Sequence, residues 1–153
     1  MTIFVAFVVR CLLVALFLPF SALDKVLNFK QAVGQAAQAV PGRFLAILLI
    51  AGGFAIEVVM SLAILTGVAD RLAALVLAFY CIVTALLWKQ FWNKPGFRRT
   101  GEGRDLFWDF LKNIALAGGF LLLAFGTDAS GVRRFASHPF ASSHPYSNVQ
   151  ESR

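Results

Sequence analysis

The chain has 153 residues, of which 59% are hydrophobic and only 14% are charged, and its formal net charge is +6. Ordinary soluble domains are about 45–50% apolar and about 25% charged, so this composition excludes a typical soluble domain and indicates a membrane protein. The length fits one domain. A positive charge suggests nucleic acid in a soluble protein, but the basic segment at residues 98–104 is short and Gly-rich, so we expect no nucleic-acid partner.

The first apolar run covers residues 2–23. It is long enough to span a bilayer as a helix, which needs about 20 mostly apolar residues. Arg10 interrupts this run and no basic segment precedes it, so we expect a membrane span and not a cleaved signal peptide. Pro19 lies inside the same run. Because proline has no backbone N–H and crowds the preceding turn, we expect it to kink the helix or open its backbone.

The linker over residues 24–43 has apolar residues at roughly helical spacing, with glutamines between them. This pattern predicts a short amphipathic helix that lies at the membrane interface or folds back against the bundle. Pro41 and Gly42 are expected to end that helix.

Three further apolar runs cover residues 44–67, 72–88 and 106–125. Glu57 interrupts the first of them, and the last carries Asp109, Lys112 and Asn113 near its start. A tight turn at residues 68–71 and a basic, Gly-rich segment at residues 89–105 connect the three runs. The sequence therefore predicts an all-α polytopic membrane protein, a four-transmembrane-helix bundle with a short amphipathic helix between helices 1 and 2.

The basic residues predict the orientation in the membrane. Four spans place the first and third linkers on one side, and positive residues are enriched in cytoplasmic loops, so we expect both termini to be periplasmic. Trp88, Trp92 and Trp108 fall at the cytoplasmic edge, as in an aromatic belt. The cations on the expected cytoplasmic side are Lys25, Lys30, Arg43, Lys89, Lys94, Arg98, Arg99 and Arg104, and those on the other side are Arg71, Arg133, Arg134 and Arg153.

Arg10 and Glu57 are opposite charges inside apolar runs. An ionised side chain in the bilayer centre costs from about 2.5 to more than 10 kcal/mol. At 1.5 Å per residue, the two lie about 13 and about 15 Å from the non-cytoplasmic ends of their helices. Because these depths are level in antiparallel neighbours, we expect an Arg10–Glu57 ion pair, which can be planar and bidentate.

Further polar residues extend this pair. Arg10, Phe17 and Asp24 are seven residues apart and share one face of helix 1. Lys112 shares a face of helix 4 with Asp109, and it is expected to reach Asp24, Asp109 or, by extension, the glutamate of helix 2. The predicted buried polar seam consists of Arg10, Glu57, Lys112, Asn113, Asp109 and Asp24.

Two interpretations of this seam remain open. Buried ion pairs can fix helix register and partner choice without any further role. Ionisable groups inside a membrane are also candidates for contact with protons, a quinone or a substrate.

Small residues indicate close helix contacts. Gly53 and Ser61 lie four residues on either side of Glu57, and Ala115 and Gly119 repeat the spacing on helix 4, a pattern that lets helices approach closely in lipid. The two cysteines, at positions 11 and 81, lie inside apolar runs without a CxxC motif, so we expect them to be small core residues.

The tail over residues 127–153 is polar, and we expect it to be extended or flexible, separate from a four-helix domain over residues 1–126. It contains the near-repeat SHPF and SHPY, at residues 137–140 and 143–146. Its two histidines have no further ligands nearby, so no metal site is expected. Two interpretations are open: a mobile tail, or an extended strip that docks on a partner protein through residues 137–146.

Several segments, in this order, resemble the DoxX family of small four-helix bacterial membrane proteins. Helix 1 has Arg10 followed by LLVALFLPFSALDK, which ends in Lys25, and helix 2 is Gly-rich with a central glutamate in AGGFAIEVVMSLAILTG. Arg71 opens helix 3, and helix 4 contains the Lys–Asn pair of KNIALAGGFLLL. The resemblance covers most of residues 2–125. The family often has glycine near the end of helix 1, where this chain has Pro19 and Ser21.

The resemblance implies a bacterial inner-membrane protein whose relatives are associated with quinone-linked sulfur oxidation or with oxidoreductase complexes that manage oxidative stress. It transfers no catalytic residue. We therefore expect an accessory or anchoring subunit of a quinone-linked membrane oxidoreductase complex. Its expected partners are membrane lipids and other membrane or redox subunits, and it would have no cofactor of its own but share a quinone with a partner. A small-solute transporter or a membrane-protein assembly factor is the alternative, and a self-sufficient enzyme is least expected because no cofactor motif is present.

Overall fold

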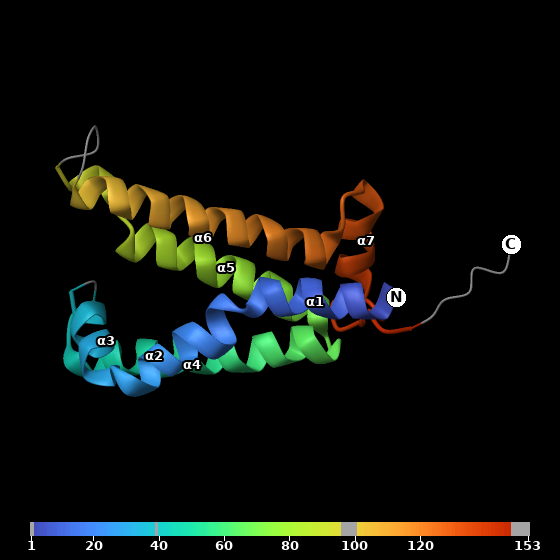
Figure 1. Cartoon of the computed structure of the whole chain (residues 1–153), viewed down its shortest axis with the longest axis horizontal. Coiled ribbons are helices and arrows are strands. Elements are labelled where there is room, and N and C mark those ends of the chain that lie inside the picture. The colour runs from blue at the N-terminus through green and yellow to red at the C-terminus, as the bar shows by residue number, and fades with distance from the viewer. Residues whose placement is uncertain (1, 39, 96–100, 148–153) are drawn as a thin grey trace, which may run out of the picture.

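The protein is a helical bundle in the computed structural model, which describes residues 2–38, 40–95 and 101–147. Within these residues, the helical segments long and apolar enough to cross a membrane are Thr2–Leu27, Arg43–Thr66, Asp70–Asn93 and Glu102–Phe125. They match the four apolar runs of the sequence. The predicted all-α bundle of four spans is therefore confirmed (Figure 1).

Helix 1 is interrupted by a wide turn. The α-helices α1 (Thr2–Val14) and α2 (Ala22–Leu27) flank the π-helix η1 (Leu16–Ser21), which contains Pro19. The N–H of Ala22 donates to the carbonyl of Phe17, five residues earlier, which is the hydrogen bond of a π turn. The backbone thus opens at Pro19 as the sequence predicts.

A short helix, α3 (Phe29–Ala36), folds back against the bundle. Its Val33 and Ala36 are buried in a small cluster with Ala46 at the start of the next span. This confirms the predicted amphipathic helix. It ends at Ala36, earlier than the expected stop at Pro41 and Gly42.

The second span, α4 (Arg43–Thr66), joins α5 (Asp70–Trp88) through a tight turn. Gly67 has a φ of +78° and Ala69 one of +48°, so two left-handed residues reverse the chain. The short helix η2 (Phe91–Asn93) follows, and α6 (Glu102–Phe125) then runs back along α5. In Figure 1 the α5–α6 pair diverges from α4 toward the end that carries α3 and η2, which we call the linker end.

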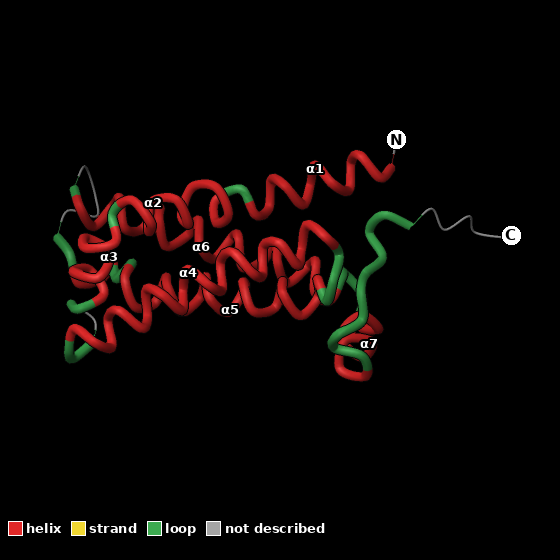
Figure 2. The backbone as a smooth tube through the Cα atoms, turned by 90° about the horizontal axis from the view of Figure 1, so that it is seen from below, coloured by secondary structure: helices red, strands yellow, loops and turns green. Residues whose placement is uncertain are grey.

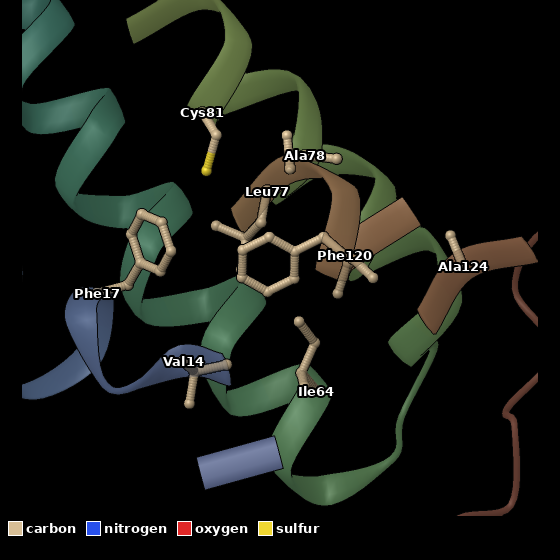
Figure 3. Close-up of a cluster of buried hydrophobic side chains, with 11 residues drawn as sticks. Val14, Phe17, Ile64, Leu77, Ala78, Cys81, Phe120 and Ala124 are labelled. Carbon is tan, nitrogen blue, oxygen red and sulfur yellow. The ribbon is translucent and has the colours of Figure 1, made fainter. Parts of the chain in front are cut away.

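The apolar core lies where the spans converge. Val14 and Phe17 of helix 1 meet Ile64 of α4, Leu77 of α5 and Phe120 of α6. The rings of Phe17 and Phe120 lie next to each other at a tilt, with centroids 5.7 Å apart (Figure 3). This core separates the linker end of the bundle from the opposite end.

The tail that we expect to be extended or flexible contains a helix shortly after the last span. Residues 129–137 form a helix, α7 (Ala129–Ser137), which packs on the end of α6. A Cβ on Gly131 would lie 1.6 Å from the carbonyl oxygen of Phe125, so only glycine allows this approach. The rings of Phe125 and Phe135 stack edge to face at 5.2 Å.

The ends of the bundle agree with the predicted arrangement of the linkers. Figures 1 and 2 place α3, the end of α5 and the start of α6 at the linker end, whereas the start of α1 and the helix α7 lie at the other end, which we call the terminal end. Trp88, Trp92 and Trp108 belong to the linker-end parts of α5, η2 and α6. Arg98, Arg99 and Arg153 lie outside the described residues, and the orientation across the membrane stays a prediction.

Candidate functional site: two buried polar clusters and a lateral cavity

Glu57 lies at the centre of the first buried polar cluster, which we call the Glu57 cluster and which consists of Ser21, Lys25, Glu57 and Tyr80. Lys25 Nζ donates to both carboxylate oxygens of Glu57, at 2.7 and 2.8 Å. The Tyr80 hydroxyl donates to Glu57 Oε1 at 2.8 Å and the Ser21 hydroxyl donates at 3.1 Å. Only 1% of Glu57 is exposed. Its charge is therefore neutralised by Lys25, and the hydroxyl groups of Ser21 and Tyr80 supply hydrogen bonds in place of water.

Local structure places these four side chains. Ser21 is the last residue of η1, and Lys25 follows it by four residues on the same face, where Lys25 Nζ also donates to Ser21 Oγ at 2.7 Å. Gly53, one turn before Glu57 on α4, leaves room for the ring of Tyr80, which lies on α5. A Cβ there would lie 3.1 Å from the Tyr80 hydroxyl oxygen.

Arg10 lies at the centre of the second cluster, which we call the Arg10 cluster and which consists of Arg10, Asp70, Ser143 and the carbonyl of Ile64. Arg10 Nη2 donates to Asp70 Oδ2 at 2.6 Å and to Ser143 Oγ at 2.7 Å, and Nη1 donates to the Ile64 carbonyl at 2.5 Å. Asp70 is fully buried. Its two oxygens also accept from the hydroxyl and the backbone N–H of Ser143, at 2.5 and 2.9 Å.

The segment at residues 143–146 covers this cluster from the terminal end. The Tyr146 hydroxyl donates to the carbonyl of Leu65, and its ring lies 6.4 Å from that of Phe7. The Pro145 ring lies against Gly67, where a Cβ would be 3.0 Å away. The SHPY motif therefore docks on the protein's own bundle, which neither interpretation of the tail included.

The expected Arg10–Glu57 ion pair is wrong. Arg10 pairs with Asp70 and Glu57 pairs with Lys25. The error lies in the assumption that the helix ends are level. Arg10 contacts Ile64, seven residues and about 10 Å along α4 from Glu57, so α1 projects beyond the end of α4.

The rest of the predicted seam is not continuous. The π turn adds one residue to helix 1, so Lys25 and not Asp24 faces the interior, and Asp24 is exposed and accepts from Asn28. Asp109 pairs with Lys89 and Lys112 at the surface, both at 3.1 Å. Asn113 donates to the Asp109 backbone carbonyl. These residues of α6 contact neither buried cluster through the hydrogen bonds and ion pairs of the described residues.

A cavity of about 830 Å³ opens beside the Glu57 cluster, where α4 and α5 diverge. Ser21, Lys25 and Tyr80 form part of its wall. Leu48 and Phe79 also line it, and these side chains are 51% and 67% exposed on the flank of the bundle. The cavity is therefore reachable from the hydrocarbon of a surrounding bilayer. Its polar rim at the linker end consists of Asp24, Gln35, Gln38, Thr84, Trp88 and Lys89.

The sequence did not identify Asp70, Tyr80, Ser21 and Ser143 as site residues. Lys25 was named as a topology signal and in the family resemblance, but not as a partner of Glu57. The spacing of Ser21 and Lys25 was an available signal because i, i+4 residues share a helix face. Asp70 carried a weaker signal, as a carboxylate in the turn next to an apolar span. Nothing local marks Ser143, which lies 133 residues from Arg10.

The small residues behave as expected of close contacts. Besides Gly53, a Cβ on Gly119 would lie 3.1 Å from the side chain of Leu13, so α6 approaches helix 1 closely. Cys81 is buried in the core, Cys11 is half-buried, and both are free.

The DoxX family model matches residues 5–90, which include both ion pairs of the two clusters. No curated protein and no solved structure matches significantly.

Proposed function

The chain belongs to the DoxX family, whose model covers more than half of it, and from this premise we propose an accessory membrane subunit of a quinone-linked oxidoreductase complex. The proposal has two parts. The cavity between α4 and α5 holds the quinone, and a separate redox subunit exchanges electrons with it.

The cavity beside the Glu57 cluster carries this proposal. Its volume of about 830 Å³ falls in the range of small-molecule sites, which enclose about 300–1,000 Å³. Its lining is mostly apolar, with polar groups on one wall and at the linker-end rim. A quinone has a matching polar part and apolar part, because it carries two carbonyl oxygens and an isoprenoid chain.

The residues present fit such a molecule. Lys25 and Tyr80 would lie next to the quinone oxygens, and the apolar side chains that reach the flank of the bundle would line the isoprenoid chain. When bound, the quinone supplies two-electron, two-proton redox chemistry. The Tyr80 hydroxyl donates to Glu57 Oε1. Tyr80 could therefore pass its proton to Glu57 Oε1 while its oxygen takes up the proton released by a hydroxyl group bound in the cavity, so that no charge is left on the tyrosine.

The test is identification of the molecule in the cavity. Wild-type protein is purified from its membrane in a mild detergent, and its bound lipids are analysed by mass spectrometry. Gly52 lines the cavity and a Cβ on it meets nothing within 4 Å. Gly52→Leu should therefore fill the space without touching the polar cluster, and the bound quinone should be lost.

A matched control lies on α6. Gly118 also has nothing within 4 Å of an added Cβ and does not line the cavity, so Gly118→Leu should retain the quinone. Wild-type protein without any bound quinone, or equal retention in both variants, would overturn the proposal. Co-purification with a stoichiometric redox subunit tests its second part.

The polar rim of the cavity favours a second candidate, a small-solute transporter. Gln35, Gln38 and Lys89 give the cavity a hydrophilic mouth at the linker end. Purified protein that forms a complex with no other subunit and moves a solute across liposomes would support this alternative. Failure of both tests would favour the remaining alternative, an assembly factor.

A further inference from the structure

A second, smaller cavity lies between α3 and the start of α4, apart from the proposed quinone site. Its volume is about 280 Å³, and its lining is Phe29, Lys30, Val33, Gly34, Ala37, Arg43 and Ile47. Two cations and no carboxylate are part of this lining. The other lining residues are apolar, and one of them is a glycine.

The two cations differ from most of the other cations that the structure describes. Lys25, Lys89, Lys94 and Lys112 each pair with a carboxylate, as do Arg10 and Arg134; these pairs are held at 2.6–3.2 Å. Lys30 and Arg43 are exposed and make no side-chain hydrogen bond or ion pair with the described residues. Two exposed cations without a counterion therefore flank one cavity, whose lining is almost wholly apolar.

The cavity also lies at the depth of lipid head groups. Arg43 is the first residue of the span Arg43–Thr66, and α3 is an amphipathic helix packed at that end of the bundle. Because the span begins here, the apolar side of the recess faces the boundary between head groups and acyl chains, and cations beside it attract phosphate groups.

We propose that this cavity is a specific site for an anionic phospholipid of the adjoining leaflet. Lys30 and Arg43 bind the head-group phosphate, and one acyl chain lies against Phe29, Val33 and Ile47. The site is independent of the quinone proposal, because its cavity shares only α3 and α4 with the other one and uses different charged residues.

The experiment is native mass spectrometry of the full chain, delipidated in detergent and titrated with phosphatidylglycerol or with zwitterionic phosphatidylethanolamine. Wild-type protein should bind one phosphatidylglycerol in preference to phosphatidylethanolamine. Each Lys or Arg near a membrane surface contributes about five-fold in affinity, so the double variant Lys30→Gln, Arg43→Gln should bind phosphatidylglycerol roughly thirty-fold more weakly. The conservative variants Lys30→Arg and Arg43→Lys should retain binding.

A charge-matched control removes two exposed cations elsewhere, in Lys112→Gln, Arg133→Gln, and should leave affinity unchanged. Gly34 lines the cavity and an added Cβ meets nothing within 4 Å, so Gly34→Leu should displace the acyl chain and weaken binding without any loss of charge. Equal weakening in the control would show a general charge effect and overturn the proposal. So would displacement of the lipid by millimolar inorganic phosphate, because the acyl chain would then contribute nothing.

Discussion

At the scale of single residues, Glu57 is held by one charge and two hydroxyl groups. Lys25, Ser21 and Tyr80 all donate to a carboxylate that is almost inaccessible. Removal of one member of a buried ion pair leaves the other charge unpaired, whereas removal of both can be nearly neutral. The pair should therefore behave as a unit in mutational tests.

Lys25→Met should lower the free energy of unfolding by about 3–5 kcal/mol, because it leaves the buried Glu57 carboxylate without its partner. Glu57→Gln should cost less, because the Lys25 side chain that it leaves unpaired is partly exposed. The double variant should lose much less than the sum of the two. Thermal unfolding in detergent measures all four proteins. Strictly additive losses would show that the two side chains do not interact.

Gly53→Ala should disturb the Tyr80 hydroxyl, because its Cβ would lie 3.1 Å from that oxygen. Overpacking of this kind costs about 1–3 kcal/mol. Gly52→Ala is the adjacent control, since its Cβ meets nothing within 4 Å. In a Tyr80→Phe background the cost of Gly53→Ala should disappear, and a cost that persists there would point to a contact other than the hydroxyl.

At the scale of elements, the hydrophobic pattern predicted the four spans because apolar runs of this length have few alternatives in lipid, and the helical spacing of apolar residues in the first linker predicted α3. It could not predict which faces meet. The face of helix 1 depends on one residue inserted at the π turn, and the seven-residue spacing of Arg10, Phe17 and Asp24 assumed an unbroken α-helix. The helix α7 was missed because its nine residues depend on the close contact of Gly131 with α6.

The N-terminus of α7 should depend on pH. The Ser130 hydroxyl donates to Asp128, and Arg134 Nη2 lies 3.2 Å from Asp128 Oδ1. Both contacts lower the pKa of Asp128 below its usual 3.8. A carboxyl whose pKa is lowered by folding stabilises the folded state above its ordinary pKa, and that contribution is lost as the pH falls below 3.8. Amide hydrogen exchange in α7 should therefore quicken at low pH relative to the spans, and less so in Asp128→Asn.

At the scale of the whole molecule, the segment at residues 143–146 ties the C-terminal region to the turn between α4 and α5. Sequence reasoning could not find this contact, since it joins residues that are 73 positions apart through one hydroxyl and one N–H. It also could not fix the relative heights of the spans. The Arg10–Glu57 prediction failed for that reason, although both residues were correctly identified as buried and paired.

The docked segment should shield Asp70. In wild-type protein Asp70 should react slowly with a water-soluble carbodiimide, and Ser143→Ala with Tyr146→Phe should speed the reaction because both anchoring hydroxyl groups are gone. Ser137→Ala is the matched control in the related SHPF motif, since Ser137 donates only to carbonyls of its own helix. Peptide mass spectrometry locates the label. Equal labelling in all three proteins would show that the segment does not shield the carboxylate.

The predicted orientation can be measured directly. A cysteine introduced at Ser130 should react with a membrane-impermeant maleimide on intact cells, whereas one at Gln31 should react only after permeabilisation, because positive residues retain the linker end in the cytoplasm. The reverse labelling pattern would place both termini in the cytoplasm.

The wide turn at Pro19 also determines where helix 1 can change its length. A π turn is an α-helix with one residue added, so deletion of one residue between Leu16 and Ser21, together with Pro19→Ala, should yield a continuous α-helix. Ser21 and Lys25 would still face Glu57. A deletion of one residue between Ala22 and Lys25 would instead turn the Lys25 ammonium group away from Glu57 by about 100°. Helix 1 can therefore lose a residue at the π turn, but not beyond it, without loss of its ion pair.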